Sequence, residues 1–343
     1  MVFYINDRPI GGEYPAYIIA EACDNHMGST EAAIEMALQA KLAGADAIKY
    51  QHHLPDEEML PDTPMSDNFD EPLYEFLKKH ALTLEQHTKI KEFCSQIGIT
   101  YLCTPFSWAA AQELNSIGVP AYKIGSGEMT DIPTLMRISS FNKPMIVSTG
   151  MATFDEIERT YNALVSNGTQ LALLNCISEY PPKYEDVNLR VINLMQSKFP
   201  NALIGHSDHT PDLFTSFSAV TLGAKIIEKH VILDKRTPGP DQSVSIDFRD
   251  LSQLVDGIRK VEASLGGDKH VHAREEQIRT WAFRSIVSTR EIKKGELISE
   301  GMIWSKRPGT GIPSYKIDEV IGRRATRDIT KNRMLSWEDI DVS

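Results

Sequence analysis

The stretch NALIGHSDHTPDLFTSFSAVTLGAKIIEKHVIL, residues 201–233, contains the repeating unit from which the fold of this chain can be inferred. An apolar run at 203–207 predicts a buried strand that ends in polar residues, and a second run at 226–232 has the same form. Between them, Thr210 and Pro211 are typical of the N-cap and the first position of a helix. This order of elements predicts a βαβ unit with parallel strands.

Similar apolar runs alternate with helix-patterned segments from Tyr17 to about Leu265. Thr153 and Glu156 form a capping box, and Gly44 follows an apolar-periodic stretch, so both predict helix boundaries. Eight strands in roughly 250 residues predict a (β/α)8 TIM barrel, with a doubly wound open sheet as the alternative. The predicted strands are residues 17–23, 47–51, 100–104, 121–125, 145–149, 171–177, 203–207 and 226–232.

Polar residues gather where these predicted strands end, which is where a barrel keeps its active site. If the sheet closes, the eight strand ends meet at one mouth. The polar positions are Glu21, Lys49, Gln51, Thr104, 123–128, Ser148, Tyr180, 207–209 and 228–230.

A second part of the chain follows the predicted barrel. Residues 267–280 are polar and without pattern, and a new apolar pattern begins at Trp281. We therefore expect a catalytic barrel at 1–266, a linker at 267–280 and a small domain of short strands and turns at 281–343. Trp281, Phe283 and Trp304 are expected to form the core of this small domain.

Composition limits the partners. Lys and Arg number 36 against 47 Asp and Glu, and a formal charge of −11 disfavours nucleic acid and anionic membranes. An anionic substrate would therefore need a local basic site. The four cysteines lack CxxC spacing, so we expect reduced core residues. The first fifteen residues contain neither a signal-like nor a membrane-spanning run, which favours a cytoplasmic protein.

Two histidines suggest a metal site. His209 and His230 lie at the ends of the last two predicted strands, which are neighbours in a closed barrel. Two imidazoles with a carboxylate, either Glu228 or Asp241, suit manganese, zinc or iron and leave positions open for substrate. Taken singly, each histidine is better explained as a hydrogen-bonded structural residue, whereas the pair at adjacent strand ends favours the metal site.

Two lysines suggest an anion site. Lys49 and Lys123 end apolar strands, where a buried ammonium is costly unless an anion compensates it. A structural ion pair would explain either lysine alone. Together with nearby hydroxyl groups they suit a phosphate and a carboxylate on one small molecule. The hydroxyl residues are Thr104, Ser126, Ser148 and Ser207.

The remaining signals concern acid–base chemistry and nucleotides. Glu21 and Glu128 are candidate acid or base carboxylates at strand ends. The segment KIGSGE at 123–128 fits neither GxGxxG nor the P-loop spacing, so nucleotide binding is unsupported. Its glycines instead permit a tight turn beside a ligand.

Taken together, the motifs resemble the bacterial N-acetylneuraminate (sialic acid) synthase family, and IKKGE (292–296) with KRPGTG (306–311) resembles its antifreeze-like SAF domain. The resemblance covers nearly the whole chain. The barrel motifs are IIAEACDNHMGS (18–29), AIKYQ (47–51), CTPF (103–106), AYKIGSGE (121–128), IVSTGM (146–151), EYPPKYEDVNL (179–189), GHSDHT (205–210), IIEKHV (226–231) and PGPD (238–241).

The resemblance implies a PEP-dependent transferase that joins phosphoenolpyruvate to an N-acyl amino sugar. It also implies a divalent metal, with Mn²⁺ expected and Mg²⁺ or Co²⁺ as alternatives, and a domain-swapped homodimer. Lys49, Gln51, Thr104, Lys123, Ser126, Ser148 and Ser207 would hold phosphoenolpyruvate. His209 and His230 would hold the metal, assisted by Glu228. Glu21, Tyr180 and Asp241 would contact the sugar, with Glu128 near the attacking water and Arg307 from the second subunit.

The chain departs from the family pattern on the sugar side. Cys23-Asp24 stands where the family commonly has Gly-(Ile/Val), and Ser178 stands where it has Asn or Thr. Ser-Gly-Glu at 126–128, where pseudaminic acid synthases carry Ser-Phe-Glu, favours the neuraminate or legionaminate branch. Alternative functions are a synthase that uses a phosphorylated aldose, and a non-catalytic carbohydrate- or ice-binding protein.

Overall fold

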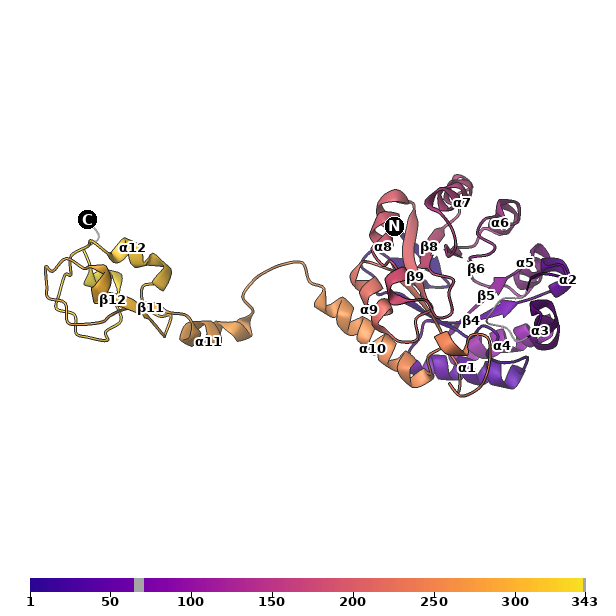
Figure 1. Cartoon of the computed structure of the whole chain (residues 1–343), viewed down its shortest axis with the longest axis horizontal. Helices are drawn as coiled ribbons and strands as arrows, with labels where there is room; N and C mark the ends of the chain where they lie inside the picture. Colours follow the sequence, from indigo (N-terminus) through magenta and orange to yellow (C-terminus); the bar gives the residue numbers. More distant parts are fainter. Residues whose placement is uncertain (65–70, 342–343) are drawn as a thin grey trace. The chain divides into compact units, whose positions relative to one another are not determined.

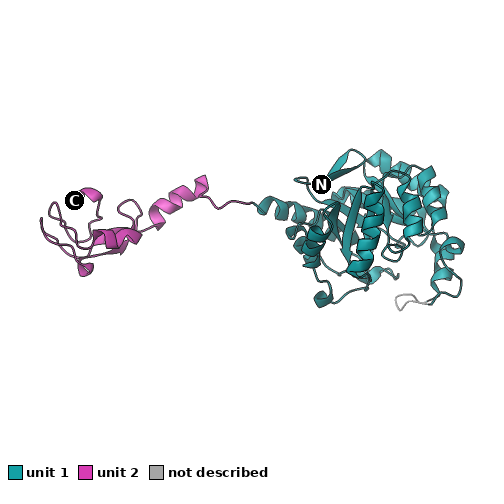
Figure 2. Ribbon diagram, turned by 90° about the horizontal axis from the view of Figure 1, so that it is seen from above, with its two compact units in different colours: residues 1–266 teal, residues 267–343 magenta. Residues whose placement is uncertain are grey.

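The computed structural model describes residues 1–64 and 71–341. The chain divides into two compact units, Met1–Gly266 and Gly267–Ser343, which Figure 2 shows in teal and magenta. Each unit has its own hydrophobic core.

The first unit is a closed barrel of eight parallel strands, in the order β5-β4-β3-β10-β9-β8-β7-β6, with β5 beside β6. The predicted TIM barrel is confirmed, and the open sheet is excluded. The predicted strands agree with the observed ones to within two residues at each end. These are β3 (Tyr17–Glu21), β4 (Ala47–His52), β5 (Thr100–Pro105), β6 (Tyr122–Ile124), β7 (Met145–Ser148), β8 (Leu171–Cys176), β9 (Ala202–Asp208) and β10 (Ile226–His230).

Helices cover the outside of the barrel (Figure 1), and the main core lies between helices and strands. The short helices α2 (Pro55–Glu58) and α3 (Leu73–His80) belong to the connection after β4. The covering helices are α1 (Thr30–Ala43), α4 (Leu84–Ile97), α5 (Trp108–Ser116), α6 (Ile132–Ser139), α7 (Phe154–Ser166), α8 (Val191–Lys198), α9 (Phe214–Thr221) and α10 (Phe248–Ser264).

Two predicted helix boundaries are confirmed and one is wrong. Thr153 and Glu156 form the capping box of α7, and Gly44 ends α1 with a φ of 89°. Thr210 does not cap α9, which begins four residues later at Phe214. The reason is local: the Asp208 carboxylate accepts hydrogen bonds from the Thr210 amide and hydroxyl, both at 2.8 Å, and holds this segment in a turn.

An N-terminal hairpin, which the sequence reading missed, packs beneath the barrel. Strands β1 (Val2–Ile5) and β2 (Arg8–Gly11) pair antiparallel. Phe3, Ile5 and Ile10 of the hairpin are buried with apolar side chains from the amino-terminal part of the barrel strands. This cluster therefore closes the amino end of the barrel.

The second unit has a core of aliphatic residues, mostly isoleucine. Its regular elements are α11 (Ala273–Ala282), β11 (Ser285–Ser288), β12 (Ile303–Lys306) and α12 (Ile317–Val320). The expectation that Trp281, Phe283 and Trp304 form this core is wrong, because all three are more than half exposed. Isoleucine and other aliphatic side chains fill the interior of this unit instead of the aromatic residues. Helix α11 begins within residues 267–280 and buries no residue, which explains why that segment shows no apolar pattern.

Candidate active site

A cavity of about 380 Å³ lies at the carboxyl ends of the barrel strands, a volume typical of small-molecule sites. Arg307 belongs to the second unit, whereas every barrel residue assigned to the site from the sequence lines this cavity. They are Glu21, Lys49, Gln51, Thr104, Lys123, Ser126, Glu128, Ser148, Tyr180, Ser207, His209, Glu228, His230 and Asp241.

Strand register brings the charged residues together. His230 on β10 lies opposite Glu21 on β3, and Glu21 lies opposite Lys49 on β4. Alternate residues of a strand face the same side, so these side chains occupy one inward-facing level. Glu228, two residues before His230, faces the same interior and pairs in register with Ser207.

Two lysines and two glutamates form a buried charge network. The Lys49 Nζ atom lies 2.7 Å from Glu21 Oε2 and 3.7 Å from Glu228 Oε1. The Lys123 Nζ atom lies 3.6 Å from Glu228 Oε1. All four side chains are at most 4% exposed. Glu228 therefore connects the two ammonium groups.

Hydroxyl groups surround these ammonium groups. Lys49 donates to Thr104 Oγ1 at 3.2 Å, and Lys123 donates to Ser148 Oγ at 2.7 Å. Ser207 donates to Glu228 Oε1 at 3.0 Å. Ammonium and hydroxyl donors at one level can bind an anion with several oxygen atoms.

The two lysines differ electrostatically. Burial opposes the charge of Lys49, but the carboxylates of Glu21 and Glu228 outweigh burial and raise its pKa above the ordinary value. For Lys123, burial prevails over Glu228 and lowers the pKa. Burial also raises the pKa of Glu21 to about 7, although Lys49 acts in the opposite direction. An additional anion beside Lys123 would relieve this imbalance.

Glu128 is positioned by a close backbone approach. Its Oε2 atom lies 2.3 Å from where a Cβ atom at position 125 would be, so a larger residue than Gly125 would displace this carboxylate. Glu128 Oε2 is buried without a hydrogen-bond partner, and burial raises the pKa of the carboxyl group. Such a group can exchange a proton with a bound ligand or water.

The histidines lie together beside Tyr180. The His209 and His230 ring centroids are 5.0 Å apart, and the Tyr180 ring is 4.4 Å from His209. His209 Nδ1 is 2.8 Å from the Ile177 carbonyl oxygen, which leaves its Nε2 for another contact. Burial lowers the pKa of His230 well below its ordinary value, so the imidazole is neutral, as a metal ligand must be.

Orphaned atoms support the fit of this site to a metal ion. His230 Nδ1 and Glu228 Oε2 are buried without a hydrogen-bond partner. The carboxylate next to His230 is that of Asp241, with Oδ2 at 4.0 Å from Nδ1. Glu228 instead contacts both lysines and Ser207 through Oε1. Imidazole and carboxylate donors suit a divalent transition metal.

An outward-facing ion pair holds the strand ends that carry the histidines. Lys229 and Asp208 pair in register on β10 and β9, and their charged atoms lie 3.3 Å apart with no exposure. Asp208 also accepts hydrogen bonds from Thr215 and Ser216 on α9. The pair therefore fastens both strands to the same helix, directly behind His209 and His230.

The structure adds cavity residues that the sequence reading did not assign to the site. His53 lies within hydrogen-bonding distance of Gln51 and Glu58, at 3.1 and 2.9 Å. Asp24, Cys176 and Ser178 also line the cavity. All four cysteines are free and buried, as expected, but Cys176 Sγ lies 4.0 Å from His209 Nε2. Cys176 lies two residues after inward-facing Leu174 on the same strand, so strand alternation could have predicted that its side chain faces the cavity.

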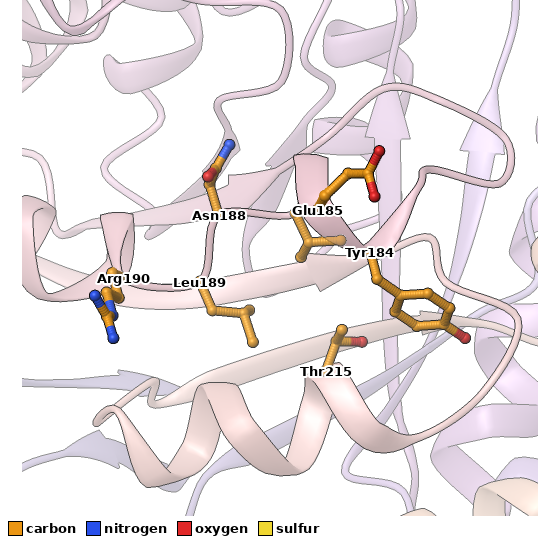
Figure 3. Close-up of a pocket in the computed structure, with 7 residues that line it drawn as sticks. Tyr184, Glu185, Asn188, Leu189, Arg190 and Thr215 are labelled. Atoms are coloured by element: carbon orange, nitrogen blue, oxygen red, sulfur yellow. The ribbon is translucent and has the colours of Figure 1, made fainter.

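A second pocket lies outside the barrel, between residues 184–190 and α9 (Figure 3). The charged side chains of Glu185 and Arg190 point away from one another there. None of the residues assigned to the site lines this pocket. It therefore lacks the convergent polar groups expected of an active site.

Comparison with known proteins agrees with this assignment. Residues 34–270 match the NeuB family model, and residues 283–341 match the SAF domain model. The chain belongs to the NeuB family. Because the family's named relatives are synthases that align over nearly the whole chain, this NeuB chain is an enzyme of the sialic acid synthase type.

Two relatives and one solved structure show how far the similarity extends. A Legionella pneumophila N,N'-diacetyllegionaminic acid synthase is 35% identical, with 98% of this chain and 97% of that protein covered. A Campylobacter jejuni pseudaminic acid synthase is 36% identical, with 91% and 93% covered. The solved N-acetylneuraminic acid (sialic acid) synthetase of Leptospira borgpetersenii, in complex with citrate, is 30% identical. Its TM-score is 0.73, with 81% of this chain and 95% of that chain covered.

Among the described residues of the NeuB chain, no helix has the length and apolar character needed to span a membrane.

Asp24 gives the site of this NeuB chain a measurable pH signature. Burial raises the pKa of Asp24 from 3.8 to about 6, and its Oδ1 atom has no hydrogen-bond partner. The folded state therefore binds more protons than the unfolded state between these values, so the free energy of unfolding falls as pH rises through this window. Asp24→Asn should remove that fall and be more stable above pH 6 by about 2–3 kcal/mol.

Urea unfolding at several pH values tests this expectation. The exposed Asp186→Asn variant is the control and should follow the wild type. Parallel stability curves for wild type and Asp24→Asn between pH 4 and pH 8 would contradict the assignment.

Proposed function

We propose that this NeuB chain condenses phosphoenolpyruvate with an N-acyl hexosamine and water, giving a nonulosonic acid and phosphate. The acceptor is N-acetylmannosamine or a related di-N-acetyl dideoxyhexose. The names of the relatives support a synthase of this class.

One observation carries the proposal: two buried ammonium groups and several hydroxyl groups converge at one level of the cavity. Phosphoenolpyruvate has a carboxylate and a phosphate attached to the same carbon atom, so it needs two cationic contacts a short distance apart. Lys49 and Lys123, connected through Glu228, provide such a pair. Gln51, Thr104, Ser126, Ser148 and Ser207 line the same cavity and would bind the remaining oxygen atoms.

The reaction requires carbon 3 of phosphoenolpyruvate to attack the open-chain sugar aldehyde. Water then adds to carbon 2, and phosphate leaves with cleavage of its bond to that carbon. Glu128, whose raised pKa lets it exchange a proton, would guide this water. Glu21, Tyr180 and Asp241, which line the same cavity, would contact the sugar.

A divalent metal held by His209 and His230, with Glu228 nearby, would polarise the aldehyde oxygen as a Lewis acid. Manganese, magnesium and cobalt are the candidate ions.

The choice of a neuraminate- or legionaminate-type acceptor rests on position 127. An atom added at Gly127 would meet nothing within 4 Å, which leaves the cavity wall open where a phenylalanine would fill it.

We further propose a homodimer in which Arg307 of one subunit completes the cavity of the other. The Arg307 guanidinium lies 5.2 Å from the Trp281 ring centroid, and Gly309 packs against Phe283. Trp281 and Phe283 are 52% and 55% exposed. Exposed aromatic residues around one arginine are typical of a surface that a partner covers.

The test of the synthase activity is direct. Full-length protein is incubated with phosphoenolpyruvate, manganese and a panel of free and phosphorylated hexosamines, and products are identified by mass. We expect a nonulosonic acid and equimolar phosphate with an unphosphorylated N-acyl hexosamine, and loss of turnover after chelation that added metal restores. If no acceptor leads to phosphate release, the proposed function is wrong. Full turnover after exhaustive chelation would show that only the metal assignment is wrong.

The anion site is tested with Lys123→Met. The variant loses a charge-assisted contact of about 1.5–3 kcal/mol, so KM for phosphoenolpyruvate should rise roughly 10- to 150-fold while KM for the sugar changes little. Lys198→Met, which removes a lysine from the outer surface, is the control. Steady-state kinetics that show equal changes in both KM values would count against this role.

The shared site is tested by subunit mixing. Arg307→Ala and His209→Ala chains should each be inactive, and mixed dimers should regain part of the activity because one of their two cavities is intact. Mass photometry or differently tagged chains can verify that mixed dimers have formed. Verified mixed dimers without activity would refute the shared arrangement.

A further inference from the structure

Cys23 lies beside two candidate metal ligands at the mouth of the barrel. One potential ligand atom each from Cys23, His230 and Asp241 lie within 4.8 Å of one another. In residues 1–64 and 71–341, no other three histidine, cysteine, aspartate or glutamate side chains meet in this way. The cysteine is fully buried and His230 is 5% exposed.

An unpaired nitrogen atom points to a missing ligand at this cluster. His230 Nδ1 is buried without a hydrogen-bond partner, and the Asp241 carboxylate is too far away for a hydrogen bond, at 4.0 Å. Buried polar atoms in folded proteins nearly always have partners. A cation bound among these side chains would supply one.

We propose that Cys23, His230 and Asp241 are joint ligands of the divalent ion, so that its coordination includes a thiolate sulfur. The proposal concerns the site of the proposed function but needs no turnover for its test. On binding, the thiol releases its proton to solvent and the sulfur forms the bond to the metal. His209, whose ring centroid is 5.0 Å from that of His230, is adjacent to the same ion.

A thiolate ligand changes which metals the site prefers. Sulfur favours zinc, iron(II) and cobalt over manganese and magnesium, which prefer oxygen ligands. The sulfur, nitrogen and oxygen donor set is also one that zinc accepts in a four-coordinate site. The chain should therefore bind these three metals more tightly than a site built from histidine and carboxylate alone.

The backbone at Cys23 supports a specific role for its side chain. Its φ of 41° lies in the left-handed region, where glycine is free and other residues are strained. Glycine is also the residue that the resembled family commonly has here. The same observation provides a test variant, because Cys23→Gly removes the thiol without straining the turn.

The structural alternative is a thiol that only contacts Asp241. Two other cysteines serve as controls. Cys176 has its Sγ atom 4.0 Å from His209 Nε2, so it is the competing sulfur donor. Cys94 lies in α4, packed in the core between helices and strands, and is the neutral control.

X-ray absorption of the zinc-loaded full-length protein tests the proposal without reference to activity. The wild type should show one sulfur ligand at about 2.3 Å, which Cys94→Ala and Cys176→Ala retain and Cys23→Gly loses. Zinc affinity of Cys23→Gly should fall at least about tenfold. The cobalt-loaded wild type should show thiolate-to-cobalt absorption that Cys23→Gly lacks.

The outcomes separate this proposal from the synthase function. Absence of a sulfur ligand in the wild type, or its persistence in Cys23→Gly, would overturn the proposal even if the enzyme makes a nonulosonic acid. If only Cys176→Ala loses the sulfur ligand, Cys176 and not Cys23 is the metal ligand, and the proposal is likewise overturned. A Cys23-dependent sulfur ligand in a protein that forms no sugar acid would sustain it while the proposed function fails. If Cys23→Gly does not fold, Cys23→Ala gives the same readout.

Discussion

The balance of buried charge between Lys49, Lys123, Glu21 and Glu228 governs the rest of the site. A single ion buried without a partner is far too costly to persist, so each of these side chains depends on its neighbours. Lys49 lies between two carboxylates, whereas Lys123 shares only Glu228. The pKa of Lys49 is accordingly raised and that of Lys123 lowered. The protein is thus balanced around Lys49 and short of negative charge around Lys123, which is where an anionic ligand gains most.

Strand alternation explains how these charges coexist with a stable barrel. On β3 the inward-facing residues run from Tyr17 through Ile19 to Glu21, from the apolar cluster at the amino end to the charged level. The residues between them face the helices and join the main core. At the carboxyl ends of β9 and β10 this outer side is charged as well, because Asp208 and Lys229 pair there. The geometry of His209 and His230 is therefore set from behind by an ion pair that no substrate reaches.

The same alternation shows why much of the barrel could be predicted and parts of the site could not. Apolar runs that end in Lys49, Lys123 or His230 contrast strongly with their surroundings, so strands and candidate residues appear together in the sequence. Cys176 gives no such contrast, since cysteine is as apolar as the strand around it and only its parity marks it as inward-facing. Cys23 follows the end of β3 in a turn, where strand alternation gives no signal. Thr210 does not cap α9, because the Asp208 carboxylate two residues earlier accepts hydrogen bonds from both its amide and its hydroxyl. The prediction that Trp281 and Phe283 are core residues was wrong, because aromatic character is not by itself a sign of burial and both side chains are exposed.

Closure of the amino end determines from which side the site can be completed. The hairpin places Phe3, Ile5 and Ile10 against the lower barrel, and a side chain at Gly11, whose φ is 100°, would meet the Met1 carbonyl oxygen and Leu203. Substrates and closing groups must therefore enter past the loops that follow the strands. Apolar side chains from these connections, Leu73 and Leu77 of α3 with Phe106 and Met151, line the same cavity as the charged level. A cavity that combines these apolar side chains with a charged level favours a ligand with an anionic head and a less polar body, and any arginine that completes the site has to approach past the same connections.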